Sequence, residues 1–324
     1  MESRPREGVA IRVVGGGNQR VGGLFDPKHQ VQLDGGAKGE LGGAGCRAGV
    51  APGLAKQFDQ EVGRAIDDLW LLGEGCRRSH EALHPLDGED PVQIAVTMRT
   101  PGCDEELAAG FFLTEGLARA GDIAGVELGD PAEIGRPENV VTVRLGRTFD
   151  PGVVAARNFV ATASCGICGK ASLDAVETRC EPLPDGPAVG RSVLLRLPPV
   201  LRAAQDVFEA TGGLHAAGLF DASGALLAVR EDVGRHNALD KVIGAMLLGG
   251  RLPLHRSILL VSGRASFEIV QKAAMAGITV TCAVSAPTGL AVEAAARLGM
   301  TLVGFLRGDG FNVYAHRQRI ELDA

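Results

Sequence analysis

The sequence predicts an α/β fold, with a sheet that carries helices on both faces and a smaller α+β domain joined to it. The clearest observation is that short apolar runs alternate with amphipathic segments after residue 258, which is typical of parallel strands with right-handed helical crossovers. Aromatic residues make up only 4% of the chain, so its core must consist mainly of Ala, Val, Leu and Ile. With 324 residues, 45% of them hydrophobic, the chain can form one large domain or two small ones.

The first 85 residues are expected to contribute little regular structure. The first 50 hold 13 glycines and a single aromatic residue, Phe25, and the glycines interrupt any helical or strand period. We interpret residues 1–85 as disordered or loosely packed, or as a segment that is not the natural start of the protein.

Residues 86–155 are predicted to form the smaller α+β domain. Alternating apolar residues indicate its strands, and acidic residues at 104–106 favour the N-terminus of its first helix. Gly116 is expected to end that helix. The expected strands are 92–98 and 140–145, and the expected helices are 104–115 and a second one that begins at Asp150.

Residues 156–324 are predicted to form the larger α/β domain, with a Cys-Gly-Ile-Cys loop at its start. A turn between two alternating runs predicts a hairpin. The polar loop Glu231–Asn237 is expected to fix this hairpin to the next helix through pairing among Asp232, Arg235 and His236. The expected strands are 214–220, 225–230, 258–261, 279–284 and 301–306, and the expected helices are 172–178, 200–210, 238–246, 266–276 and 288–298.

Composition and charge argue against several classes of protein. The net charge of −6 is unlike that of a general nucleic-acid binder, whose surface would be basic. No run of 18 apolar residues is present, and no apolar core follows the charged N-terminus, so we expect a cytoplasmic protein without a membrane span. Seven cysteines, five of them isolated, do not suggest a disulfide framework.

Three loops are expected to lie together at the carboxyl ends of the strands, where open parallel sheets bind their ligands. They are Ser262–Ser266, Ser285–Thr288 and Arg307–Gly310. The first two lead into helix N-termini, which attract anions, and Arg264 and Arg307 add positive charge suited to phosphate. Either a phosphorylated or nucleotide ligand binds here, or the loops are ordinary turns with helix caps.

The pair Cys165-Gly-Ile-Cys168 is the main candidate for chemistry, and Lys170 nearby could stabilise a thiolate. Structural zinc needs four ligands, and only Cys180 and His215, a residue otherwise expected to be structural, could complete the set. A zinc deaminase would need a His-x-Glu sequence and a proline next to its first cysteine, and the chain has neither. A carrier of persulfide sulfur and a thiol–disulfide oxidoreductase both stay open.

Seven stretches of the chain carry a family resemblance. They are Met98-Arg-Thr-Pro-Gly, Glu106–Gly116, Ser164-Cys-Gly-Ile-Cys-Gly169, Thr211-Gly-Gly-Leu-His215, Glu231–Lys241, Ser262–Glu268 and Gly304–Tyr314. In this order they resemble the FdhD family, the formate dehydrogenase accessory sulfurtransferases. No single stretch is decisive, but seven in the family's order are highly specific.

The resemblance implies a sulfurtransferase that takes sulfur from a cysteine desulfurase as a persulfide on Cys165, with Cys168 as its partner. It would deliver this sulfur to a molybdenum cofactor with two guanine dinucleotides, for use in formate dehydrogenase. The alternative is a cofactor-binding chaperone that carries no covalent sulfur. The fold would resemble cytidine deaminase with a smaller domain attached, and the protein would be a homodimer without a metal of its own. The candidate cofactor-binding residues, from the family's segment and the strand-end loops, are Phe305, Leu306, Arg307, Gly308, Asp309, Gly310, Ser262, Arg264 and Ser285.

The chain departs from the family pattern before its first matching stretch. The family has an acidic Glu-Pro-Leu strand there, whereas this chain reads His84-Pro-Leu-Asp after a glycine-rich segment. If that strand is missing, damage to the smaller domain is the expected consequence.

Overall fold

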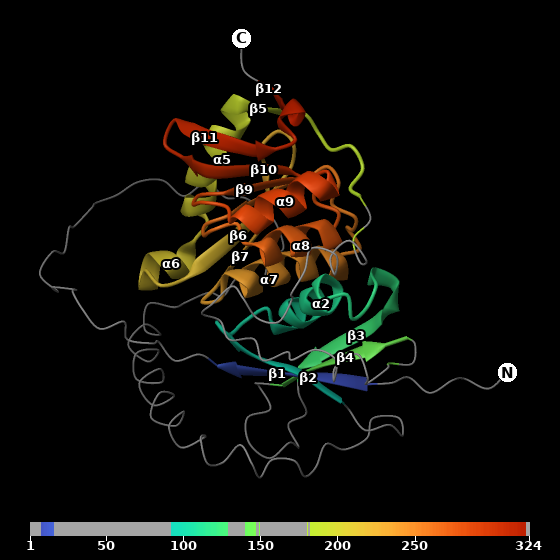
Figure 1. The fold of residues 1–324 in the computed structure, drawn as a ribbon. Helices are drawn as coiled ribbons and strands as arrows, with labels where there is room; N and C mark the ends of the chain where they lie inside the picture. Colours follow the sequence, from blue (N-terminus) through green and yellow to red (C-terminus); the bar gives the residue numbers. More distant parts are fainter. Residues whose placement is uncertain are drawn as a thin grey trace, which may run out of the picture. The chain divides into compact units, whose positions relative to one another are not determined.

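The computed structural model describes residues 8–15, 92–128, 140–146, 149, 180 and 182–321. These residues belong to one unit of the chain, which joins Met1–Gly15 to Glu81–Ala324. It contains a four-stranded sheet with one long helix against it and a six-stranded sheet with helices on both faces (Figure 1). The predicted mixed α/β class is therefore confirmed. The likeness to cytidine deaminase and the domain boundaries stay predictions.

The smaller sheet combines strands that are far apart in the sequence. These are β1 (Gly8–Gly15), β2 (Val92–Arg99), β3 (Ile123–Leu128) and β4 (Val140–Leu145). Their order is β2-β1-β4-β3, with β1 parallel to β2 and antiparallel to β4. Helix α2 (Asp104–Thr114) packs against β3 and β4 and places Leu107 and Phe112 in one apolar cluster with Val143. A short 3-10 helix, η1 (Ala120–Asp122), leads into β3.

Strand β1 departs from the prediction that residues 1–85 lack regular structure. Its sequence, Gly8-Val-Ala-Ile-Arg-Val-Val-Gly15, is rich in the β-branched residues that favour strands. Neighbouring strands on both sides satisfy its backbone donors and acceptors, which the local sequence could not predict. The altered region around His84 lies outside the described residues.

The larger sheet contains the five strands that the sequence predicted for this part of the chain and one that it did not predict, β11. They are β6 (His215–Phe220), β7 (Leu226–Asp232), β8 (Ile258–Val261), β9 (Val280–Ala283), β10 (Thr301–Arg307) and β11 (Gly310–Ala315). Their order is β11-β10-β9-β8-β6-β7. The parallel strands β8, β9 and β10 and the antiparallel β6–β7 hairpin confirm the predicted topology. Because β6 is antiparallel to both β8 and β7, β7 runs in the same direction as β8.

Helices cover both faces of this sheet (Figure 1), and all residues of its central strands β8 and β9 are buried. Along β8, Ile258 and Leu260 pack in the cluster of α5, whereas Leu259 and Val261 pack in the cluster of α7, α8 and α9. The helices are α5 (Arg191–Ala203), α6 (Asp206–Thr211), α7 (Arg235–Leu248), α8 (Phe267–Met275) and α9 (Gly289–Leu298). Strand β12 (Ile320–Glu321), which follows η3 (Arg317–Arg319), pairs in parallel with β5 (Val189–Gly190), which directly precedes α5.

Several boundaries differ from the sequence prediction. Helix α5 begins at Arg191, whereas a helix was expected only from 200 to 210. It contains two prolines, which disfavour a helix, but its buried apolar stripe stabilises it; the stripe consists of Leu194, Leu197 and Leu201. Strand β7 and helix α7 take up most of the predicted polar loop Glu231–Asn237.

The sequence prediction omitted β3 and β11. The predicted helices at 150 and at 172–178 lie outside the described residues. None of the helices in the described part of the chain is long and apolar enough to cross a membrane.

Candidate functional site

Four strands of the larger sheet, β7, β8, β9 and β10, end at the same edge because they run in the same direction. Backbone hydrogen bonds join the loops that follow three of them. The amide of Ser285 donates to the Gly263 carbonyl (3.4 Å), that of Thr288 donates to the Ala265 carbonyl (3.0 Å), and that of Phe305 donates to the Ser285 carbonyl (3.1 Å). The three loops predicted to converge therefore lie side by side. Their role in ligand binding stays a prediction.

The end of β10 has an unusual backbone at one of the predicted cofactor residues. Phe305 adopts a φ of 54°, in the left-handed region that non-glycine residues rarely occupy, where the pairing of β10 with β11 is interrupted. The Arg307 guanidinium lies 5.8 Å from the centre of the Phe305 ring, and Arg307 is exposed. Leu306, between them, is buried in the core. Strained backbone of this kind is often found at ligand sites.

The turn Arg307–Gly310 is held by helix α5. Gly308 has a φ of 60°, which lets the chain reverse between β10 and β11. The Arg191 guanidinium donates a hydrogen bond to the Asp309 carbonyl (2.8 Å). The turn is thus anchored through its backbone, while the side chains of residues 307 and 309 are exposed at the edge.

His215 and Arg235, which were not predicted as ligands from the sequence, flank the loop after β8. Ser262 Oγ accepts a hydrogen bond from the amide of Ala216 at the start of β6 (2.9 Å). A methyl group at Gly263 would lie 3.5 Å from Nδ1 of His215 and 3.8 Å from Cδ of Arg235. His215 at the start of β6 and Arg235 at the start of α7 therefore belong to the same edge.

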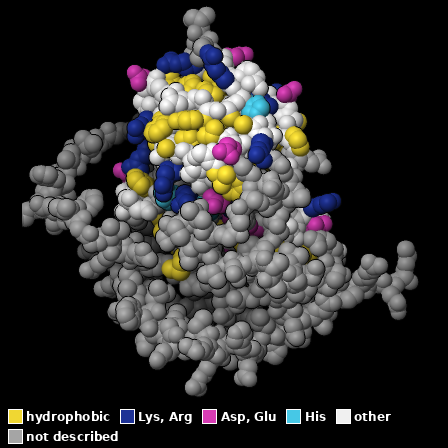
Figure 2. Space-filling view, in the orientation of Figure 1, with side chains coloured by type: hydrophobic (Ala, Val, Ile, Leu, Met, Phe, Trp, Pro, Cys, Tyr) yellow, Lys and Arg dark blue, Asp and Glu magenta, His cyan; other side chains and the backbone are white. Residues whose placement is uncertain are grey.

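Positive charge gathers around this loop. Burial lowers the pKa of the Arg235 guanidinium, the neighbouring charge of Arg264 lowers it further, and Glu268 opposes the shift. The buried Nε atom of Arg235 has no hydrogen-bond partner among the described residues. Lys and Arg side chains gather on the side of the molecule where α6 lies (Figure 2). Two guanidinium groups that repel each other, one of them with an unsatisfied donor, favour an anion at this place.

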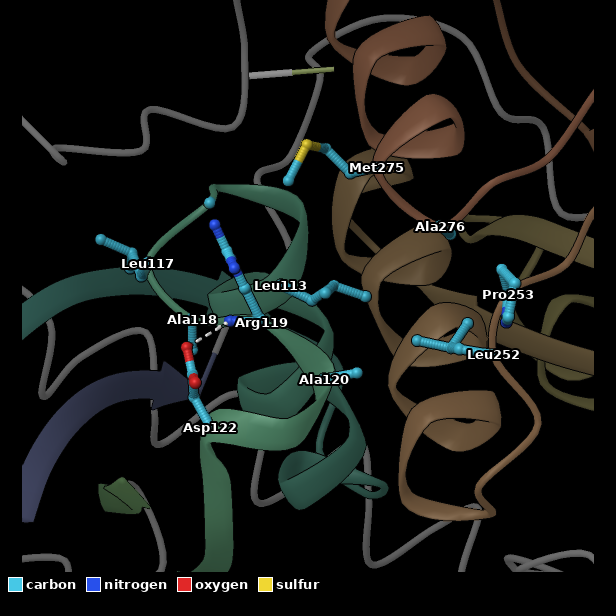
Figure 3. A pocket seen from close by; sticks show the side chains of 11 residues that line it. Leu113, Leu117, Ala118, Arg119, Ala120, Asp122, Leu252, Pro253, Met275 and Ala276 are labelled. Atoms are coloured by element: carbon cyan, nitrogen blue, oxygen red, sulfur yellow. Dashed lines mark hydrogen bonds between the residues drawn. The ribbon is translucent and has the colours of Figure 1, made fainter. Parts of the chain in front are cut away.

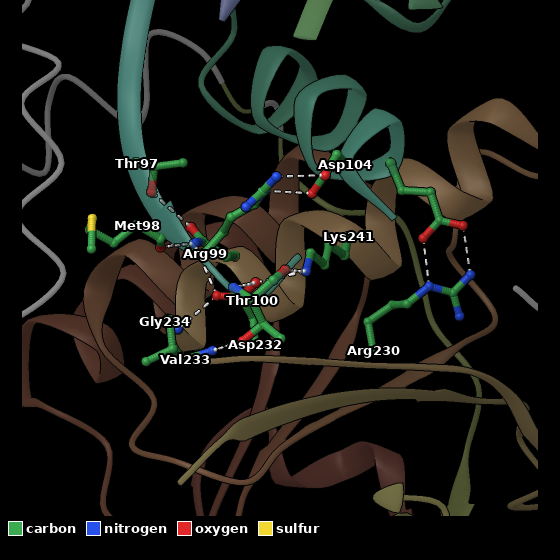
Figure 4. A network of polar contacts seen from close by, with 12 residues as sticks. Thr97, Met98, Arg99, Thr100, Asp104, Arg230, Asp232, Val233, Gly234 and Lys241 are labelled. Carbon is green, nitrogen blue, oxygen red and sulfur yellow. Dashed lines mark hydrogen bonds and ion pairs between the residues drawn. The ribbon is translucent and has the colours of Figure 1, made fainter. Parts of the chain in front are cut away.

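The end of β2 fixes the turn that precedes α7 (Figure 4). Asp232 is fully buried, and its Oδ2 lies 2.7 Å from Lys241 Nζ and accepts a hydrogen bond from the Thr100 amide (3.0 Å). Lys241 also donates to the Thr100 carbonyl (2.7 Å), and Asn237 donates to the Met98 carbonyl (2.7 Å). Asp232 Oδ1 also accepts hydrogen bonds from the Gly234 amide (2.8 Å) and the Asn237 side chain (3.1 Å), so Asp232 does pair within the polar loop. Its ion pair is with the equally buried Lys241, and the predicted pairing with Arg235 and His236 stays a prediction.

The imidazole of His215 is less readily protonated than that of an ordinary histidine. Burial lowers its pKa below the usual value of about 6.5, the charge of Arg235 lowers it further, and Asp232 opposes the shift. Near neutral pH His215 is therefore uncharged and can accept a hydrogen bond.

We expect acid to destabilise the protein through His215. In the unfolded chain His215 becomes protonated at about pH 6.5, and in the folded chain only at lower pH. The contribution of His215 to the free energy of unfolding is therefore fully present above about pH 6.5 and is lost as the pH falls through the folded pKa. The melting temperature should fall between about pH 7 and about pH 5.5, and it should fall less in His215→Gln than in the parent. An equal fall in both proteins would contradict this assignment.

The cavities in the described part of the molecule include the following two. One, of about 390 Å³, is bounded by Ser262 and His215 at the strand edge. The other, of about 810 Å³, lies between the end of α2 and the turn before β8, where Leu113, Arg119 and Met275 line it (Figure 3). The second cavity is at the amino end of β8 and therefore away from the converging loops.

The predicted sulfur-bearing pair, Cys165 and Cys168, lies outside the described residues, as does Lys170. The described thiols are Cys103, Cys180 and Cys282, and burial strongly raises the pKa of the Cys282 thiol. Within the described ranges, no three His, Cys, Asp or Glu side chains are grouped closely enough to hold a metal ion.

The fold and its basic edge define an α/β protein whose candidate binding site lies at the carboxyl ends of parallel strands. A sequence profile of the FdhD/NarQ family matches residues 89–321. The chain belongs to the FdhD/NarQ family.

Relatives from distant organisms support this membership. The chain is 52% identical to the sulfur carrier protein FdhD of Streptomyces coelicolor over 253 residues, which cover 74% of this chain and 90% of the relative. It is 44% identical to the sulfur carrier protein FdhD of Sulfurisphaera tokodaii over 233 residues, which cover 72% of this chain and 86% of the relative. A crystal structure assigned as a formate dehydrogenase accessory protein from Desulfotalea psychrophila is 27% identical, with a TM-score of 0.53, and covers 69% of this chain and 82% of its own.

Proposed function

We propose that this protein is a sulfurtransferase that carries sulfur as a persulfide on Cys165, with Cys168 as its partner. The donor would be a cysteine desulfurase, and the acceptor a molybdenum cofactor with two guanine dinucleotides that serves formate dehydrogenase. The observation that carries the proposal is the 52% identity to a sulfur carrier protein over 90% of that protein's length. Both cysteines lie within residues 89–321, which the family profile matches.

The loading step needs no oxidant or reductant. The Cys165 thiolate attacks the outer sulfur of the donor's persulfide, a new S–S bond forms as the donor's S–S bond breaks, and the donor leaves as a thiolate. For release, the Cys168 thiolate attacks the inner sulfur of Cys165 and HS⁻ leaves toward the cofactor. A dithiol reductant then reduces the Cys165–Cys168 disulfide to two thiols.

The strand edge supplies groups suited to the acceptor's phosphates. The side chains of Arg264 and Arg307 are exposed there, and the loops with Ser262 and Ser285 lead toward the N-termini of α8 and α9. The cofactor would be a substrate that binds and leaves. The family resemblance also implies a homodimer, and the sequence favours the cytoplasm; both stay predictions.

A mass measurement tests the proposal. Incubation with a cysteine desulfurase and cysteine should add one sulfur atom to the intact protein, and Cys165→Ala should abolish the addition because the accepting thiolate is gone. Cys103→Ala, which removes a described thiol of intermediate exposure, is the matched control and should still gain the sulfur. A Cys165→Ala protein that still gains sulfur and still activates formate dehydrogenase would refute the assignment. Stoichiometric zinc that is lost in Cys168→Ser would point to a metal site instead.

A further inference from the structure

The cavity of about 810 Å³ is a groove between two walls at the amino end of β8 (Figure 3). One wall runs from the end of α2 to η1, and the other consists of the turn before β8 and the end of α8. Leu113 from the first wall and Leu252 from the second point toward each other across the groove (Figure 3). The groove therefore lies at the opposite edge of the sheet from the converging strand-end loops.

Backbone hydrogen bonds fix both walls of the groove. Gly116, with a φ of 64°, ends α2, and the Leu117 amide returns to the Phe112 carbonyl (2.8 Å). In the other wall, the Leu254 amide donates to the Ala276 carbonyl (2.9 Å), which ties the turn before β8 to the end of α8. A groove with fixed walls loses little conformational entropy when a partner enters it, which favours binding.

Apolar side chains are accessible along the groove. Pro253 is exposed, and Leu252 and Met275 are half-buried. Leu248, the last residue of α7 and four positions before Leu252, is 48% exposed. Adjoining exposed apolar side chains of this kind mark a surface that another molecule covers. A small polar ligand would need several converging polar groups, which the lining of this groove lacks, so an apolar side chain of a protein fits it better.

The rim of the groove is basic. Arg119 lines it, and Arg251 and Arg256 belong to the turn before β8; all three are exposed. No described residue forms an ion pair with any of these three guanidinium groups, whereas the exposed Arg202 elsewhere pairs with Glu209 (2.9 Å). The chain as a whole carries a net charge of −6, so this rim is a local exception. Its charge is complementary to an acidic partner surface.

We propose that this groove docks the sulfur donor, the cysteine desulfurase, through a segment of that protein with an apolar side chain flanked by acidic residues. The apolar side chain would enter between Leu113 and Leu252, and the acidic residues would face Arg119 and Arg251. The inference rests on the proposed function and adds the surface that holds the donor. A donor docked at the amino ends of the strands leaves the opposite edge free for the acceptor cofactor, so the two do not compete.

Calorimetric titration of the full-length protein with the cysteine desulfurase tests the charged part of the proposal. Arg119→Glu should bind the desulfurase about tenfold more weakly, because like charges then meet, whereas Arg119→Lys keeps the charge and should bind like the parent. Arg196→Glu is the matched control: Arg196 is exposed on α5, which covers the other face of the sheet, so the same change of charge should not alter the affinity. Added salt should weaken the parent complex.

Leu252→Ser tests the apolar part. It removes a wall of the groove and should also weaken desulfurase binding about tenfold. Thermal melting of each variant shows whether it is folded. Sulfur loading measured by mass should be slower than in the parent at low desulfurase concentration and equal to it at saturating concentration. Glutathione persulfide, a small donor that needs no docking surface, should load the parent, Arg119→Glu and Leu252→Ser equally.

Parent-like affinity for the desulfurase in folded Arg119→Glu and Leu252→Ser would overturn the proposal. Equal weakening in Arg119→Glu and Arg196→Glu would reduce the basic rim to an effect of net charge and would overturn that part. Variants that lose binding to formate dehydrogenase, or that change the oligomeric state, while still binding the desulfurase would assign the groove to another occupant and also overturn it. A parent that binds the desulfurase through the groove but gains sulfur from neither donor would refute the carrier function and leave the docking surface standing.

Discussion

Lys272→Met is expected to lower the free energy of unfolding by about 3–5 kcal/mol, because it leaves two buried carboxylates without their cation. The Lys272 ammonium is 6% exposed and lies 2.8 Å from Asp240 and 3.0 Å from Glu115. It also donates to Thr114 Oγ1 (2.9 Å). Burial alone lowers the pKa of Lys272, but the two carboxylates outweigh burial and raise it above the ordinary lysine value.

This cluster joins three helices. Lys272 belongs to α8 and Asp240 to α7, whereas Thr114 and Glu115 lie at the end of α2, against the smaller sheet. The loss should therefore loosen the packing of α2 on the larger domain, and it can be measured by urea unfolding.

The control is an ion pair at the surface. Glu127→Gln removes the partner of Arg144, with Glu127 55% exposed, and should cost at most about 1 kcal/mol. In the double variant Lys272→Met with Asp240→Asn, part of the loss should be recovered, because one unpaired charge disappears. If Lys272→Met costs no more than Glu127→Gln, the cluster does not hold the helices together.

The run from β8 to β10 could be predicted from the sequence within one or two residues. Each of its strands is a short apolar run and each of its helices has an amphipathic pattern with a stop, so local signals were sufficient. Strand β1 could not be predicted, because Gly8–Gly15 stands in a glycine-rich segment and is stabilised by strands more than 75 residues away in the sequence.

The candidate site could be predicted only in part, for a similar reason. The loops after β8, β9 and β10 follow from the parallel pattern, whereas Arg235 and His215 reach the same edge only because β6 lies next to β8 and returns the chain as β7. This strand order is a tertiary property. A hairpin in the sequence indicates that its strands pair with each other, but not which strand of the sheet they join.

The second large effect is expected where α2 crosses α7. An alanine methyl group at Gly110 would overlap the Asp240 carbonyl oxygen and lie 2.6 Å from the carbonyl carbon. A methyl group at Gly244 would overlap the Glu106 carbonyl oxygen in the same way and lie 2.9 Å from the Gly110 amide nitrogen. The helices thus touch through their backbones, which a change of rotamer cannot relieve.

Gly110→Ala and Gly244→Ala should each lower the free energy of unfolding by about 3 kcal/mol, the upper end of the cost of overpacking. The direction of this change is informative, because replacing glycine by alanine in an unobstructed helix would raise the free energy of unfolding by up to about 1 kcal/mol. Gly289→Ala provides that comparison: Gly289 is the first residue of α9, a methyl group there would meet nothing within 4 Å, and the variant should be neutral or slightly stabilised.

The double variant Gly110→Ala with Gly244→Ala distinguishes helix contact from two independent defects. The two glycines face each other, so the separation of the helices forced by the first methyl group also makes room for the second. The combined loss in urea unfolding should therefore be clearly smaller than the sum of the single losses. Additive losses would show that α2 and α7 do not move apart as rigid helices, and that each methyl group is accommodated by local distortion of its own helix.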